Sequence, residues 1–142
     1  MITRTASATY EGFGKEGKGK VSTQSGVLSD NPYGFNTRFE NEPGTNPEEL
    51  IAAAHASCFT MALSFALARE GLSDGTLTTR AAVKLDKEGE GFKVSRSDLV
   101  LEAHVPGIDA ERFAAIAADA KANCPISKLL NAEITLEHSL SA

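Results

Sequence analysis

Two cysteines are the residues of this chain whose types and spacing could do chemistry. Cys58 falls inside a long apolar run that indicates a helix, and Cys124 falls immediately before Pro125, where a second helical pattern breaks. A buried cysteine by itself behaves as a small hydrophobe. Upstream, however, Arg38 and an acidic pair that begins at Glu48 add a cation and carboxylates. Together with two thiols, these groups are the components of a thiol redox site.

A nucleophilic role for Cys58 needs a reason for its thiol to ionise, because a free thiol is mostly protonated at neutral pH and burial disfavours the thiolate further. An arginine at contact distance favours the thiolate by about 4 kcal/mol at an effective dielectric near 20, before desolvation is subtracted. Arg38 is the candidate, because it follows an aromatic segment just before the helix. Glu48 could hold that arginine in place, although the helix dipole alone also explains an acidic residue in a first turn.

The N-terminal part of the chain is predicted to form strands and turns. Glycine and serine punctuate residues 1–45, and aromatic residues alternate with small or polar ones over Tyr33–Phe39, which is the period of a strand with one buried face. Arg38 is therefore expected to point away from those aromatic side chains. The segment Gly12–Lys18 matches the first part of a phosphate-binding loop, but Gly19 stands where serine or threonine is needed. We expect a hairpin turn there.

A long helix is predicted to follow. Asn46 is a capping residue, Pro47 occupies the first helical position, and Glu49 comes three residues after the cap. The helix is expected to run to Glu70 and to stop at Gly71, because glycine favours the conformation that ends helices.

The remaining elements are predicted from their periodicity. Alternation begins a strand at residue 76, a glycine-rich turn follows, and the return strand shifts its phase by one residue near Ser95 to Asp98, which is a bulge signature. A second helix contains Phe113, and a last strand covers Ala132 to Leu140. This order predicts one α+β domain with one core, spanning residues 1–142.

Composition argues against two classes of partner. A net charge of -5 lacks the basic face that nucleic acids or anionic membranes require. Residues 50–68 are uncharged and close to the length of a membrane span, but His55, Ser57, Thr60 and Ser64 interrupt them, so we expect a helix buried in protein. No apolar signal segment begins the chain, so a cytoplasmic location is expected, where disulfides are usually transient and catalytic.

The residues alone leave three classes of function open. One is a thiol redox enzyme, and a second is a non-enzymatic stress or ligand-binding protein whose cysteines are structural. The third is a metal-binding module, in which His55 and Cys58 share a metal with Cys124 and one of His104 or His138, although their spacing fits no known zinc finger or ribbon. A structural cysteine needs no arginine, and a metal site needs neither the arginine nor an apolar pocket.

A set of segments carries a resemblance that covers nearly the whole chain. The segments are Tyr33–Phe39, Gly44–Leu50 leading to His55–Phe59, Val105–Asp109 and Cys124–Ser127. They resemble the osmotically inducible protein C (OsmC) branch of the OsmC/Ohr family. Its specific part is an Asn-Pro-Glu helix start with a cysteine ten residues after the Glu. Many members carry a tryptophan where this chain has Tyr10, and we expect that difference to affect packing and not chemistry.

The resemblance implies an activity, an assembly and site residues. The family consists of thiol-dependent peroxidases that reduce organic hydroperoxides, built as intertwined homodimers with antiparallel sheets packed around a long central helix. Cys58 matches the peroxidatic cysteine and Cys124 the resolving cysteine. Arg38 matches the arginine that activates the thiolate, and Glu48 matches the acid that positions it. The implied cycle passes through a Cys58 sulfenic acid and a Cys58–Cys124 disulfide that an external dithiol reduces, with no cofactor and no metal.

An apolar pocket lined by Phe59, Met61 and Phe65 would favour large hydroperoxides over hydrogen peroxide. The reason is that burial of an alkyl tail contributes ~0.8 kcal/mol per methylene, and hydrogen peroxide has no tail to bury.

Helix geometry gives a separate reason for a dimer. Glu48 and Cys58 are ten residues apart, which is about 15 Å along a helix at ~1.5 Å per residue, so one guanidinium cannot contact both. For Glu48 to position the arginine that serves Cys58, the Glu must come from a second, antiparallel copy of the helix. We therefore predict an obligate homodimer with two sites, each combining Cys58 and Cys124 of one chain with Arg38 and Glu48 of the other.

Overall fold

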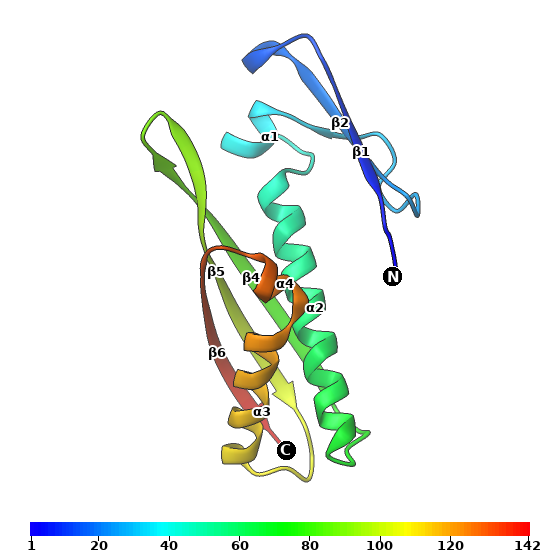
Figure 1. Cartoon of the computed structure of the whole chain (residues 1–142), viewed down its shortest axis with the longest axis vertical. Coiled ribbons are helices and arrows are strands. Elements are labelled where there is room, and N and C mark those ends of the chain that lie inside the picture. Colours follow the sequence, from blue (N-terminus) through cyan, green and yellow to red (C-terminus); the bar gives the residue numbers. More distant parts are fainter. The chain divides into compact units, whose positions relative to one another are not determined.

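The structure is a computed structural model that describes all residues from 1 to 142 (Figure 1). The chain divides into two compact units, residues 1–50 and residues 51–142. The expectation of a single domain stays a prediction.

The first unit contains a three-stranded antiparallel sheet in the order β1-β2-β3. Its strands are β1 (Ala6–Glu11), β2 (Lys18–Thr23) and β3 (Asn31–Tyr33), and a single 3-10 turn, η1 (Gly14–Glu16), lies between the first two. The glycine-rich segment is thus the connection of a β1–β2 hairpin, and the hairpin prediction is confirmed.

Gly19 lies where two aromatic rings meet in this sheet. Tyr10 and Tyr33 pack edge to face with their ring centroids 5.9 Å apart. A Cβ atom at position 19 would come within 2.6 Å of the Tyr33 ring and 2.9 Å of the Tyr10 ring, so only glycine fits without a shift. The Tyr10 hydroxyl also donates a hydrogen bond of 3.0 Å to the Gly14 carbonyl. Tyr10 therefore packs and fastens the β1–β2 hairpin.

The segment after β3 is a short helix, α1 (Phe35–Phe39), and not the predicted continuation of the strand. Thr37 explains the change, because its hydroxyl accepts from the Gly34 N–H at 2.8 Å and donates to the Gly34 carbonyl at 3.0 Å. The two phenylalanines of α1 are four residues apart, and their rings lie 5.1 Å from each other. Arg38 lies over the Phe39 ring at 5.5 Å, so the expectation that it points away from the aromatic residues is wrong.

The long helix is confirmed as α2 (Pro47–Arg69), one residue shorter than predicted. Asn46 caps its start, because its side-chain oxygen accepts from the Glu49 N–H at 2.8 Å. At the other end, Gly71 adopts a positive φ of 86°, and the Leu72 N–H donates to the Leu67 carbonyl at 3.2 Å. Asn46 therefore caps the helix and Gly71 ends it, as the sequence indicates.

The second unit contains a three-stranded sheet in the order β4-β5-β6. Its strands are β4 (Thr76–Glu88), β5 (Gly91–His104) and β6 (Glu133–Ser141), and two helices, α3 (Ala110–Asn123) and α4 (Pro125–Leu129), connect β5 to β6. The α+β class is confirmed. One pairing differs from the expected antiparallel sheets, because β5 and β6 run parallel. The bulge is also confirmed, since Ser95 lies unpaired between two residues that pair with β4.

The core of the second unit joins α2, α3 and β5. Its residues follow the helical period on α2 and α3 and the strand period on β5. They include Phe59, Leu63 and Leu67 of α2, Leu99, Leu101 and Ala103 of β5, and Phe113, Ile116, Ala117 and Ala120 of α3. Burial of each large side chain contributes about 1.5–3 kcal/mol, so this core fixes the part of α2 that carries Cys58 against the end of α3 that leads to Cys124.

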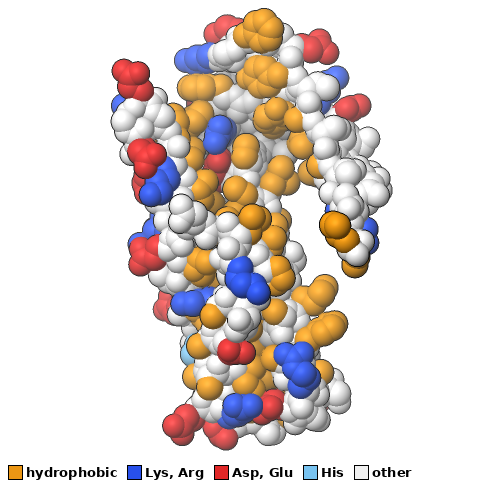
Figure 2. Space-filling model, viewed as in Figure 1, with side chains coloured by type: hydrophobic (Ala, Val, Ile, Leu, Met, Phe, Trp, Pro, Cys, Tyr) orange, Lys and Arg blue, Asp and Glu red, His pale blue; other side chains and the backbone are white.

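Helix α2 is long and apolar enough to cross a membrane by length and composition, a test that core helices of globular proteins also meet. One of its faces is buried through His55, Phe59 and neighbours at helical spacing. On another face, Met61 and Phe65 are each 62% exposed, and hydrophobic side chains are visible at the surface along α2 (Figure 2). The helix expected to be buried in protein is thus buried on one side only in a single chain.

Candidate active site

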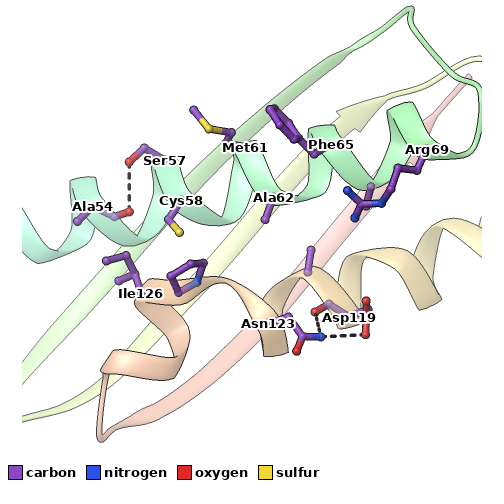
Figure 3. Close-up of a pocket in the computed structure, with 13 residues that line it drawn as sticks. Ala54, Ser57, Cys58, Met61, Ala62, Phe65, Arg69, Asp119, Asn123 and Ile126 are labelled. Atoms are coloured by element: carbon purple, nitrogen blue, oxygen red, sulfur yellow. Dashed lines mark hydrogen bonds between the residues drawn. The ribbon is translucent and has the colours of Figure 1, made fainter. Parts of the chain in front are cut away.

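Cys58 lies in the middle of α2, one residue before the core residue Phe59, and is half-buried. Its sulfur is directed away from the helix toward the segment that carries Ile126 (Figure 3). The helical period places Cys58 at the edge of the buried face, so its sulfur borders both the core and a surface cavity.

Cys124 lies at the junction of α3 and α4 and is fully buried, with 0% exposure. Its N–H donates to the Ala120 carbonyl at 2.9 Å, and its carbonyl accepts from the Lys128 N–H at 3.1 Å. Pro125 ends α3 because it has no N–H to continue the helix, and the same residue suits the first position of α4. The break that the sequence predicts is therefore what directs the Cys124 sulfur toward Cys58.

The two thiols are free, and each affects the pKa of the other. Burial raises the pKa of the Cys58 thiol, and the contact with Cys124 raises it further against a weaker effect of the Ile126 N–H. Burial also opposes ionisation of Cys124, but contacts with Cys58 and with the Ser127 hydroxyl and backbone outweigh it, so the pKa of Cys124 is lowered. Burial thus opposes ionisation of both thiols, and a thiolate at Cys58 requires a nearby positive charge.

Arg38 and Glu48 form a two-point ion pair within residues 1–50. The Arg38 Nε donates to one carboxylate oxygen of Glu48 and its Nη2 donates to the other, both at 2.9 Å. The side chain of Glu48 is 13% exposed and that of Arg38 is 35% exposed. Two parallel hydrogen bonds fix the plane of the guanidinium. The pairing of these residues that the sequence suggests is therefore present, and the Nη1 group stays available for another acceptor.

A cavity of about 700 Å³ borders Cys58. It lies between α2 and the α3–α4 segment, with Cys58 toward one end and Arg69 toward the other (Figure 3). Met61 and Phe65 line it, as predicted. Phe59 does not, because it is fully buried in the core, and that part of the prediction is wrong. The lining is mainly apolar, which suits an alkyl or aryl group beside the thiol.

The ring of His55 lies between two serine hydroxyls. Its Nδ1 lies 2.6 Å from the Ser97 hydroxyl and its Nε2 lies 2.8 Å from the Ser127 hydroxyl, so both ring nitrogens already have partners. His104 contacts a serine, His138 lies against the Phe113 ring, and the chain has no cluster of three side chains able to hold a metal ion. The metal-binding alternative therefore lacks a ligand set.

The contacts of His55 are what sequence reasoning missed. Ser97 is 42 positions from His55 and Ser127 is 72 positions away, and nothing in the sequence links a histidine to two serines at such distances. The one available signal is that each serine occupies a position facing the core, where a polar side chain must find a partner.

Comparison with known proteins gives a consistent result. Residues 39–139 match the family model described as OsmC-like protein. The chain is 54% identical over 141 residues to Peroxiredoxin OsmC of Escherichia coli (strain K12), with 99% of each chain covered. The crystal structure of the organic hydroperoxide resistance protein OhrB of Bacillus subtilis aligns with a TM-score of 0.67 at 31% identity, covering 95% of this chain and 98% of that one. An organic hydroperoxide resistance protein from Elizabethkingia anophelis aligns with a TM-score of 0.72 at 27% identity, covering 99% and 96%.

Proposed function

The chain belongs to the OsmC-like protein family, and we propose that it is a thiol-dependent peroxidase that reduces organic hydroperoxides to alcohols. The observation that carries the proposal is the free thiol of Cys58 at an apolar cavity, with the free thiol of Cys124 buried beside it. Relatives of this chain bear the names peroxiredoxin and organic hydroperoxide resistance protein, which supports the same reaction.

The proposed cycle uses both cysteines. The Cys58 thiolate attacks one oxygen of the hydroperoxide, the O–O bond breaks, and the alkoxide leaves and takes up a proton to become the alcohol. Cys58 is then a sulfenic acid. The Cys124 thiolate attacks its sulfur, a disulfide forms, and hydroxide leaves as water. An external dithiol restores both thiols by exchange.

Activation of Cys58 is proposed to come from Arg38. The surroundings of Cys58 oppose ionisation, so the thiolate requires a fixed positive charge nearby. The guanidinium of Arg38 stays charged at any relevant pH, its plane is fixed by Glu48, and its Nη1 is available for the sulfur.

The site is proposed to form between two subunits of an obligate homodimer. Helix α2 is continuous from residue 47 to residue 69, so Glu48 and Cys58 are separated by about 15 Å of helix rise. Because Arg38 is bound to Glu48, we propose that each Cys58 and Cys124 pair is served by Arg38 and Glu48 of the partner subunit. The exposed Met61 and Phe65 on α2 support a helix surface that a second copy covers.

Cavity shape supports a preference for bulky hydroperoxides. Met61 and Phe65 can cover an alkyl or aryl group, and burial contributes ~0.8 kcal/mol per methylene. Hydrogen peroxide gains nothing from this surface.

A cytoplasmic location stays a prediction.

Titration with peroxide tests the proposed function. When reduced protein is mixed with limiting cumene hydroperoxide, we expect two thiols to be lost and one alcohol to form for each peroxide consumed. In the Cys124→Ser variant, one thiol should be lost per peroxide, and Cys58 should become reactive toward a dimedone-type probe because its sulfenic acid has no resolving partner. If the thiols are not consumed by peroxide, the cysteines are structural and the proposed function is wrong. If Cys58 is not labelled in Cys124→Ser, Cys124 is not the resolving cysteine.

A further inference from the structure

A buried polar cluster adjoins the thiol pair. His55 of α2, Ser97 of β5 and Ser127 of α4 are 0%, 0% and 8% exposed, and the histidine ring bridges the two hydroxyls at 2.6 and 2.8 Å. Apolar residues of similar size could fill the same space without the desolvation of four polar atoms. The cluster connects three separate elements, and one of its members also contacts Cys124.

Burial lowers the pKa of His55, which favours the neutral form of its ring. A neutral imidazole donates from one nitrogen and accepts at the other. If Nε2 carries the proton, Nε2–H donates to the Ser127 hydroxyl oxygen, and the Ser97 hydroxyl donates to Nδ1. The hydroxyl proton of Ser127 is then free for another acceptor. In the opposite tautomer, Ser127 must donate to the ring and has no proton to offer elsewhere.

Ser127 lies in the first turn of α4, three residues after Cys124, and its hydroxyl favours the thiolate form of Cys124. Cys124 has no exposed surface, so a thiolate there depends on donors from the protein and not on bulk water. The N–H groups of Ile126 and Ser127 at the start of α4 favour such a thiolate. The Ser127 hydroxyl can add a donor only when His55 donates to it.

We propose that His55 is a positioning residue for the resolving step, in which its Nε2–H turns the Ser127 hydroxyl toward Cys124 and holds Cys124 as a thiolate ready to attack the oxidised Cys58. This inference rests on the proposed function. In the step it serves, the Cys124 thiolate donates an electron pair to the Cys58 sulfur, the S–S bond forms, the S–O bond breaks, and hydroxide leaves as water with one proton from solvent.

Two substitutions of His55 separate this role from simple packing. A glutamine reaches as far as Nε2 and carries an N–H donor there, whereas an asparagine reaches only the position of Nδ1. Both keep a polar amide at the site. We therefore expect His55→Gln to retain the donor to Ser127 and His55→Asn to lose it.

Titration of Cys124 without peroxide gives the first measurement. In a Cys58→Ser background, Cys124 is the single cysteine, and the neighbouring Cys58 thiol no longer affects its titration. The ultraviolet absorbance of the thiolate then reports the ionisation of Cys124 alone. We expect His55→Asn to lower the ionisation constant of Cys124 about tenfold, and His55→Gln to restore it to within about twofold. Equal titration curves for the two variants, or an unchanged curve in both, would overturn the proposal.

The lifetime of the Cys58 sulfenic acid gives the second measurement, with both cysteines present. After one equivalent of cumene hydroperoxide, the Cys58 sulfenic acid should stay reactive toward a dimedone-type probe about ten times longer in His55→Asn than in the parent protein at neutral pH. This lifetime should return toward the parent value at higher pH. His55→Gln should not prolong it. If His55→Asn does not fold, Ser127→Ala and Ser127→Thr make the same comparison, because alanine removes the hydroxyl and threonine keeps it. An unchanged Cys124 titration in Ser127→Ala would overturn the proposal. Since the titration uses no peroxide, its result is independent of whether the protein reduces hydroperoxides.

Discussion

Replacement of Cys58 by serine is expected to abolish hydroperoxide reduction, with a loss of at least about a thousandfold, because a hydroxyl is almost never ionised at neutral pH and is a far weaker nucleophile toward the O–O bond. Cys124 cannot take over this role. Its sulfur is fully buried, whereas Cys58 borders the cavity. We therefore expect Cys124 to attack the adjacent sulfur of Cys58 and not a peroxide from solution.

Consumption of cumene hydroperoxide in the presence of a dithiol checks this expectation. Ser64→Ala is a suitable control, because Ser64 is an exposed residue of the same helix and does not line the cavity beside Cys58. The control should keep the parent rate. Substantial turnover by Cys58→Ser would remove the basis of the mechanism.

Replacement of Arg38 by lysine is expected to lower the rate of hydroperoxide reduction at least about tenfold at neutral pH, although the charge is kept. An ammonium group cannot form the two-point pair that Arg38 makes with Glu48 and also present a donor to a sulfur. Burial and the contact with Cys124 already raise the pKa of Cys58. Without a well-placed guanidinium, less thiolate is present at a given pH, so the rate should recover as the pH rises.

The pH dependence of Cys58 alkylation, followed by mass spectrometry, measures this effect. The midpoint should move to higher pH in Arg38→Lys. Arg112→Lys is a matched control, because Arg112 makes an equivalent two-point pair with Glu70, at 2.7 and 2.9 Å, on the periphery of another helix. An alkylation profile in Arg38→Lys that matches this control would show that Arg38 does not activate Cys58.

Elements with local signals could be predicted from the sequence. Helix α2 begins after a capping asparagine and ends at a glycine, and both signals act within one helical turn. The segment Phe35–Phe39 could not be assigned in this way. Its two phenylalanines are spaced by four, which fits both the strand period and one helical turn, and the bonds between Thr37 and Gly34 decide in favour of the helix. The parallel pairing of β5 with β6 could not be predicted either, because the sequence of a strand does not indicate which strand it pairs with or in which direction.

Some residues of the candidate site could likewise be predicted from the sequence, and others could not. Cys58 and Cys124 could be found because the chain has only two cysteines, each in an unusual local context. The cluster around His55 depends on two serines from distant segments, and serines are too common for their positions to indicate a contact. The pKa of Cys124 is likewise lowered against the effect of burial by contacts with Cys58 and with the start of α4, which only the folded chain reveals.

If two subunits build each peroxidase site, as we propose, mixed dimers should show it. A Cys58→Ser chain paired with a Glu48→Ala chain should form one complete site, with Cys58 and Cys124 from the second chain and Arg38 and Glu48 from the first. Random mixing of equal amounts should restore about a quarter of the parent activity, since about half of the dimers are mixed and each has one working site.

The matched control mixes Cys58→Ser with Cys124→Ser. Both cysteines of a site are proposed to come from one chain, so this mixture should contain no complete site and should stay inactive. We expect restored turnover of cumene hydroperoxide in the first mixture and none in the second. A first mixture no more active than its separate parents would contradict the two-subunit site.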